Sequence, residues 1–154
     1  MGQREDRLAE LGYPLERLAK PAATYRPLMR DGNLVYLSGA LPFDGEAHIV
    51  SRGKVPTQVS VPAAQHAAAL CVANHLRFLY AELGSLDSVV SVIRLCAYVN
   101  SDPDFVEQHV VANGASELLI DVLGDAGWHA RSSVGVASLP LGASVEVDLI
   151  VRVG

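Results

Sequence analysis

Hydrophobic and polar positions alternate most regularly at the end of the chain, where Val145, Val147, Leu149 and Val151 occupy every second position. A period of two is typical of a strand that buries one face. The run before it, residues 130–137, alternates in the same way, and "LPLG" joins the two runs. The pattern therefore predicts two C-terminal strands, the last of which has one clear core face.

Two further strand patterns lie nearer the N-terminus. The stretch "TYRPLMRDGNLVYLSGALPFDG" predicts a strand, a tight turn at Asp31-Gly32-Asn33 and a second strand that ends at Ser38-Gly39. The stretch "AHIVSRGKV", residues 47–55, predicts a shorter third strand with a glycine break.

A helical period replaces the strand period after residue 60. Val72, Leu76, Leu79 and Leu83 recur at helical spacing and predict a helix from about Pro62 to Gly84 with one buried stripe. The β-branched run "DSVVSVIRLCAYVN" then predicts a long strand, and because it follows a helix we expect it to pair in parallel with an earlier strand.

A second long helix is predicted after that strand. "SDPDFVEQHVVANGASELLIDVLGDAG" offers Ser101 or Asp102 as an N-cap before Pro103, and the pattern ends at Gly124. The complete order is βββαβαββ, which predicts an α+β fold with both helices on one face of a mixed sheet. We expect a charged helix at residues 3–11 within an N-terminal arm, 1–20, and one domain over residues 21–154.

The second face of the sheet needs a cover, because many strand residues are apolar or small in so short a chain. Copies of the chain packed sheet against sheet would supply it, so we expect a homo-oligomer.

Charge and composition narrow the function classes. A formal net charge of -5 and a pI near 5.4 argue against nucleic acid as a partner, since phosphate binding needs clustered Lys and Arg. No apolar run approaches the roughly 18 residues of a membrane span, and the first residues are charged, so we expect no membrane partner and a cytoplasmic protein. Cys71 and Cys96 lie among apolar residues, as inert buried thiols do.

Motifs for metal, nucleotide or nucleophile chemistry are absent from the sequence. The five histidines, at 48, 66, 75, 109 and 129, have no zinc-ligand spacing, and neither a phosphate-binding glycine loop nor a G-x-S-x-G elbow occurs. His129 stands two residues before Arg131 and could line a pocket with it.

Arg131 is the first candidate for function. Alternation puts it on one face of its strand with Ser133, Gly135 and Ala137, which leave room beside a guanidinium that could bind a carboxylate or phosphate bidentately. A solvated edge charge or a partner for a nearby acid explains the same spacing. Other polar candidates stand at strand ends and on helix faces, and they are Tyr25, Ser38, Asn113 and Glu146.

The segment "ARSSVGVASLPLGASVEVDLIV", with "NLVYLSGALP" and "YVNSDPDF", resembles the RidA/YjgF family of reactive-intermediate deaminases, also labelled endoribonuclease L-PSP. The match spans residues 21–154, and the sequence resembles a divergent branch of the family. The resemblance implies a chorismate mutase-like fold, a homotrimer and ligand clefts between subunits. It also implies hydrolysis of enamine and imine intermediates, such as 2-aminoacrylate and 2-iminopropionate, to a 2-keto acid and ammonia, without a metal or cofactor.

By position in the motif, Arg131 resembles the carboxylate-binding arginine and Glu146 the acid that places the attacking water. The residues that resemble the substrate-binding set are Tyr25, Ser38, Gly39, Asn113 and Ser133. Many family members have a cysteine where this chain has Ser133, so thiol reactivity cannot be carried over. A trimeric protein that binds carboxylate ligands without turnover is the alternative, and a ribonuclease, which the older label suggests, fits the acidic charge poorly.

Overall fold

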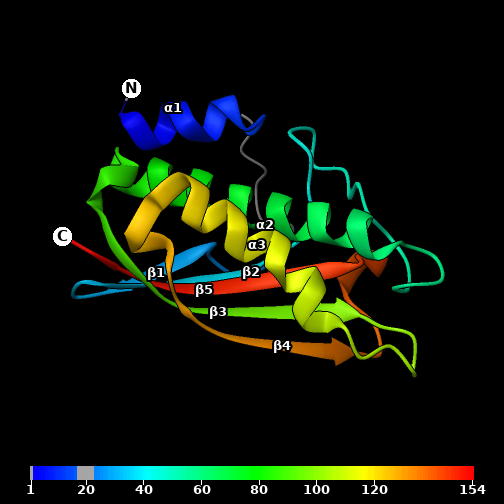
Figure 1. Ribbon diagram of the computed structural model, residues 1–154. Helices are drawn as coiled ribbons and strands as arrows, with labels where there is room; N and C mark the ends of the chain where they lie inside the picture. The colour runs from blue at the N-terminus through cyan, green and yellow to red at the C-terminus, as the bar shows by residue number, and fades with distance from the viewer. Residues whose placement is uncertain (1, 17–22) are drawn as a thin grey trace.

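In the computed structural model, which describes residues 2–16 and 23–154, a five-stranded sheet has two long helices packed on one face (Figure 1). The helices are α2 (Val61–Leu83) and α3 (Gln108–Leu123), and the strands lie in the order β1-β2-β5-β3-β4 across the sheet. The α+β fold class that the sequence predicts is confirmed.

The N-terminal hairpin is formed by β1 (Leu28–Asp31) and β2 (Leu34–Ala40). The strand ends pair directly, so Gly32 and Asn33 alone make the turn. Gly32 has φ +60, a left-handed conformation that glycine adopts without the strain of a side chain. The predicted tight turn is confirmed.

Helix α2 follows the predicted bounds within a residue. The hydroxyl of Ser60 accepts a hydrogen bond from the backbone N–H of Ala63 at 3.3 Å, which caps the first turn, and Pro62 fills an early position. At the other end Gly84 has φ +78, so its left-handed backbone ends the helix.

Helix α3 begins later than the sequence predicts, at Gln108 and not at the Ser101 or Asp102 cap. The Asp102 carboxylate accepts from the backbone N–H and the hydroxyl of Thr57, at 3.0 and 2.7 Å. It therefore binds a different loop and does not cap the helix. The helix ends at Leu123, one residue before Gly124.

The remaining strands are β3 (Val89–Asn100), β4 (Ala130–Val136) and β5 (Val145–Val153). Strand β3 pairs in parallel with β4 and antiparallel with β5, so the predicted parallel pairing with an earlier strand is wrong. β5 lies between β2 and β3, which run in the same direction but do not touch as neighbours. For the same reason β4 and β5, consecutive in the sequence, do not form a paired hairpin, because β3 separates them.

The third strand predicted at 47–55 is also wrong. This segment makes isolated single-residue bridges, in which Ile49 meets Phe43, Arg52 meets Ala143 and Val55 meets Ser101. Since these partners lie on three different segments, no continuous ladder forms. The order of strands and long helices is therefore ββαβαββ behind the N-terminal helix.

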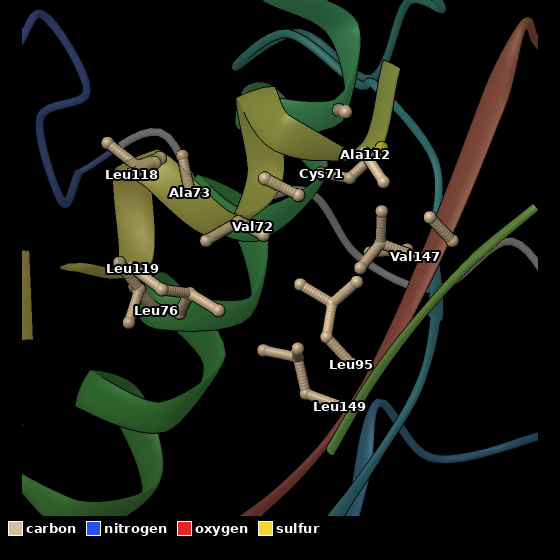
Figure 2. Packing of buried hydrophobic residues seen from close by; sticks show 14 of the residues in the cluster. Cys71, Val72, Ala73, Leu76, Leu95, Ala112, Leu118, Leu119, Val147 and Leu149 are labelled. Carbon is tan, nitrogen blue, oxygen red and sulfur yellow. The ribbon is translucent and has the colours of Figure 1, made fainter. Parts of the chain in front are cut away.

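The core lies between the helices and the sheet. Figure 2 shows Leu95 of β3 and Leu149 of β5 pointing toward Leu76 of α2 and Leu119 of α3, and all four are at most 1% exposed. Complete burial of such a side chain contributes about 2 kcal/mol relative to leaving it in water. The predicted core face of β5 is confirmed.

The N-terminal helix α1 (Gln3–Glu10) lies on the outer side of the helical layer (Figure 1). The Arg4 guanidinium donates to the carbonyls of Leu86, Val89 and Leu123, and Leu8 is fully buried. The predicted charged helix is confirmed, and it is docked on the body. Residues 17–20 of the predicted arm lie outside the described residues, so the domain boundary stays a prediction.

The face of the sheet opposite the helices carries exposed apolar side chains. Met29, Tyr36 and Val134 are 56%, 45% and 42% exposed, and their strand positions are out of phase with the buried core positions. Such exposure over one face is typical of a surface that another chain covers. The homo-oligomer stays a prediction with this physical support.

Candidate functional site

A cleft of about 470 Å³ opens beside the junction of β2 and β5. Its wall combines polar residues with an apolar side, which is typical of small-molecule sites. The lining residues are Ala23, Tyr25, Ser38, Gly39, Leu41, Phe43, Pro140, Leu141 and Glu146. The structure thus brings together four of the predicted site residues, which are Tyr25, Ser38, Gly39 and Glu146.

An irregularity in the sheet shapes this cleft. Leu37 pairs with Leu149 and Ala40 with Val147, so β2 has one more residue than β5 over this interval, and Ser38 and Gly39 lie within the bulge. A β-bulge bends a strand and redirects its side chains. The Ser38 hydroxyl donates to the carbonyl of Arg26 at 2.7 Å, which holds the segment that carries Tyr25 against β2.

Gly39 is required where the bulge meets Glu146. A Cβ atom on residue 39 would lie 2.8 Å from Cδ of Glu146 and closer still to Oε1. Atoms at that separation overlap, so any side chain at position 39 would displace the carboxylate. Gly39 therefore leaves the space that the Glu146 carboxyl group occupies.

The electrostatic environment of Glu146 favours a proton-transfer role. Burial raises the pKa of this carboxyl group above its ordinary value of 4.5, and the negative charge of Asp148 raises it further. The Tyr98 hydroxyl donates to Asp148 at 2.8 Å, and these hydrogen-bonded groups lie on the same sheet face as Glu146. Among the described residues, no group donates a hydrogen bond to the Glu146 carboxylate, so its oxygens face the cleft unpaired.

Arg131 lies on the other face of the sheet. It pairs in register with Leu95, whose side chain is buried under the helices, and residues in register across a parallel pair point to the same face. Its guanidinium contacts α3: Nη1 donates to Asn113 Oδ1 at 2.9 Å and to Ser116 Oγ at 3.1 Å, and Nη2 donates to the His109 carbonyl at 3.2 Å.

This arrangement excludes one interpretation of Arg131. Among residues 2–16 and 23–154, no carboxylate lies within 4.0 Å of the guanidinium, so the arginine is not the partner of a nearby acid there. Neutral acceptors hold it instead, and its positive charge is not compensated. Ser133 lies two residues further along β4, in register with Ala97, and shares this face.

Asn113 and Gly114 lie inside α3 although both residue types have low helix propensity. The structure gives a separate reason for each of them. Asn113 accepts from Arg131, as described. At Gly114 helix α3 passes so close to the Gln65 carbonyl of α2 that a Cβ atom would overlap it. Gln65 also donates from Nε2 to the Val110 carbonyl at 2.8 Å, which joins the two helices at the same point.

Sequence reasoning missed Ser116, which lies one helical turn beyond Asn113 and reaches the same guanidinium. The spacing i, i+3 was the available signal, since such residues share a helix face. Ser116 Oγ also bonds His129 Nε2 at 2.9 Å, so His129 reaches Arg131 through the serine and not directly. Burial lowers the pKa of His129 below its ordinary 6.5, with a smaller contribution from Arg131.

The other titratable candidates are structural. Cys71 is fully buried, and burial raises the pKa of its thiol well above the ordinary value. His75 is fully buried on α2 and donates from Nε2 to the Val147 carbonyl. Within the described ranges, no group of three or more His, Cys, Asp or Glu side chains could hold a metal ion.

A single chain therefore holds two separate groups of predicted site residues. Tyr25, Ser38, Gly39 and Glu146 line the cleft at the β2–β5 junction, whereas Arg131, Asn113 and Ser133 lie on the helix side of β4. The two groups are separated by the sheet itself and by the intervening strand β3.

Comparison with known proteins places this arrangement in a family. A sequence model described as "Endoribonuclease L-PSP" matches residues 16–153. The chain belongs to the endoribonuclease L-PSP family. Its predicted membership is thus confirmed, over almost the whole of the described body.

Relatives within the family differ in their similarity. The chain is 41% identical to Protein TCP17 of Trypanosoma cruzi over 146 residues, which cover 94% of this chain and 91% of that protein. It is 47% identical to a protein of unknown function from Agrobacterium tumefaciens, with a TM-score of 0.92, covering 98% and 92% of the two chains. RidA from an Antarctic Psychrobacter is 25% identical, with a TM-score of 0.64 and coverage of 90% and 95%.

No helix among the described residues combines the length and apolarity needed to cross a membrane.

Proposed function

We propose that the chain hydrolyses reactive imines of 2-keto acids, of the 2-iminopropionate and 2-aminoacrylate type. The Glu146 carboxyl group carries the proposal: it lies in a cleft with its oxygens unpaired, against a glycine that makes room for it, and its pKa is raised by burial. Membership of a family that includes RidA supports the same reaction class.

The reaction needs little more than positioning and one proton acceptor. Water adds to the carbon of a protonated imine, and Glu146 takes a proton from that water and passes it to the amino nitrogen of the adduct. The C–N bond then breaks, ammonia leaves, and it takes up the proton that the hydroxyl group loses as the carbonyl forms. The balanced change is RC(=NH₂⁺)COO⁻ + H₂O → RC(=O)COO⁻ + NH₄⁺. A carboxylate with a raised pKa is a stronger base than an ordinary one, which suits this step near neutral pH.

Arg131 binds the substrate carboxylate in this proposal. Its guanidinium is fixed by three neutral acceptors and has no carboxylate partner within the described residues, so a ligand carboxylate would be its first counter-ion. A charge-assisted hydrogen bond of this kind contributes about 1.5–3 kcal/mol.

The separation of the two groups by the sheet argues for a site shared between chains. Arg131 of one subunit would face the Tyr25 and Glu146 cleft of the next, in a homotrimer whose sheets cover one another's exposed faces. A head-to-tail interface of this kind closes into a ring and repeats the same composite site at each junction.

The test generates 2-iminopropionate with an amino-acid oxidase and 2-aminoacrylate with a dehydratase, and follows their decay with and without the protein. We expect accelerated decay with wild type and only the spontaneous rate with Arg131→Ala or Glu146→Gln. A wild-type protein that leaves both decay rates unchanged contradicts the proposal, and carboxylate binding without turnover would then favour a ligand-binding protein.

Mixed oligomers test the shared site directly. Arg131→Ala and Glu146→Gln chains are unfolded together and refolded at equal amounts, so that roughly a quarter of the junctions join an intact Glu146 to an intact Arg131. Activity should return toward about a quarter of wild type. Mixing Arg131→Ala with Arg131→Gln gives no intact pair and serves as the control. No recovery of activity in the first mixture would mean that both residues act within one chain, or that one of them is not part of the site.

A further inference from the structure

A chain of hydrogen bonds runs from Arg131 to a histidine that does not touch the guanidinium itself. Arg131 Nη1 donates to Ser116 Oγ at 3.1 Å, Ser116 Oγ bonds His129 Nε2 at 2.9 Å, and His129 Nδ1 bonds the Gly127 carbonyl at 2.6 Å. These hydrogen bonds link Arg131 to Ser116 on α3 and, through the serine, to His129 in the segment that leads into β4.

The donors in this chain follow from its acceptors. The Gly127 carbonyl can only accept, so Nδ1 of His129 carries a proton. In the neutral ring Nε2 is then an acceptor, and the Ser116 hydroxyl donates to it. This leaves the lone pairs of Ser116 Oγ free to accept from Arg131. While His129 is neutral, every donor in this series, the serine hydroxyl included, therefore has an acceptor.

We propose that Ser116 and His129 are positioning residues for Arg131, and that neutral His129 holds the guanidinium in the geometry that binds a carboxylate. The inference rests on the proposed role of Arg131 in carboxylate binding. It adds a residue pair that acts through the arginine and gives the site a dependence on pH.

Protonation of His129 reverses one bond and adds a charge. Nε2–H would then donate to Ser116 Oγ, the serine proton would lose its acceptor, and the imidazolium and Arg131 would both donate to one oxygen. A second positive charge would also lie close to the guanidinium. Both effects loosen Arg131, so ligand binding should weaken as the pH falls through the pKa of His129, which lies below the ordinary 6.5 because the ring is half-buried.

The charged groups around His129 do not offer it another partner. Glu117 on α3 and Asp125 beside Gly127 make no hydrogen bond or ion pair with the ring among the described residues, and Arg94 of β3 bonds Ser132 instead. Arg131 is the charged group that acts on the pKa of His129. His109 has an exposed side chain and gives only its backbone carbonyl to Arg131, so it provides a matched control.

The first measurement uses the ligand-free protein. Nitrogen NMR of the histidine rings should find neutral His129 with its proton on Nδ1, and titration should give a pKa below 6.5 that rises in Arg131→Gln. A predominant Nε2–H tautomer, or a pKa that Arg131→Gln leaves unchanged, overturns the proposal. This readout does not depend on any enzymatic activity.

The second measurement is the affinity for pyruvate, the carboxylate product, from pH 7.5 down to about one unit below the His129 pKa that the titration gives. It is made in the Glu146→Gln background, because Glu146 also gains a proton toward the acid end of this range. Affinity should fall about tenfold with intact His129, as expected for the loss of one charge-assisted hydrogen bond. With His129→Gln, which accepts from Ser116 and cannot titrate, affinity should change less than about twofold. His109→Gln should keep the full pH dependence.

Ser116 variants separate positioning from folding. Ser116→Ala should weaken pyruvate binding at pH 7.5 by about tenfold and abolish the pH dependence, whereas Ser116→Thr, which keeps a hydroxyl, should restore both. The same pH dependence in His129→Gln as in its parent, or none in the parent, overturns the proposal. Failure of the imine assay with these binding results intact would refute the proposed reaction alone, while absence of pyruvate binding at every pH overturns both.

Discussion

His75 should make the folded protein markedly less stable in mild acid. Its ring is fully buried between α2 and the sheet, and Nε2 donates to the Val147 carbonyl at 2.6 Å. Nδ1 is buried without a hydrogen-bond partner in the described part of the chain, so a proton placed there would have no acceptor. Burial accordingly lowers the pKa of His75 from 6.5 to about 4.

The sign of the effect follows from this lowered pKa. The unfolded chain protonates His75 near pH 6.5, whereas the folded chain does so only near pH 4, so the unfolded state binds more protons between these values. The free energy of unfolding therefore falls as the pH drops through this window. Linkage with these two pKa values gives a loss of about 2 kcal/mol between pH 7 and pH 5.

The assay is urea unfolding followed by circular dichroism at pH 7, 6 and 5, at one fixed protein concentration because association contributes to stability. His75→Gln keeps a donor for the Val147 carbonyl and cannot titrate, so its stability should fall by about 2 kcal/mol less than wild type over this range. His66→Gln, an exposed histidine on the same helix, should behave as wild type. The reasoning would be refuted if the free energy of unfolding fell equally with pH in wild type and in His75→Gln.

Variants at three further positions test the site and the packing. Gly39→Ala should abolish imine hydrolysis and leave the melting temperature within a few degrees, because its methyl group displaces only the flexible Glu146 carboxyl group; retained activity would contradict the proposed role of that acid. Gly114→Ala should destabilise the fold by about 2 kcal/mol, because the methyl group meets the Gln65 backbone and forces the two helices apart, and an unchanged midpoint in urea would contradict this contact. Ser60→Ala should lower stability by about 1 kcal/mol through loss of the α2 cap, whereas Ser60→Asp should restore it.

The pH dependence of catalysis should follow Glu146. Its pKa is raised above 4.5 by burial, so the rate of imine hydrolysis should fall on the acid side at a higher pH than an exposed carboxylate would give. Measuring the pH dependence of the rate in the His129→Gln variant separates the acid-side fall due to Glu146 from any fall due to protonation of His129. An acid limb centred at or below 4.5 would contradict the buried position of Glu146.

Local patterns in the sequence were sufficient for most elements. The β1–β2 turn, both ends of α2 and the buried face of β5 depend on residues within one turn or one strand, through a glycine at positive φ, a serine cap and strict alternation. The start of α3 could not be predicted in this way, because Asp102 binds Thr57, which is distant in sequence. The segment at 47–55 failed likewise, since its bridges depend on three separate partners.

The sequence by itself determined the family and the chemical types at the site. The arginine, the glutamate and the Ser-Gly pair are identifiable because each lies within a short motif of fixed spacing. Only the tertiary structure decided where they lie, because insertion of β5 between β2 and β3 is a long-range pairing that no local pattern specifies. The register of β3 with β4 and with β5 puts Arg131 and Glu146 on opposite faces of this sheet, and that separation is the physical reason why the proposed site needs a second chain.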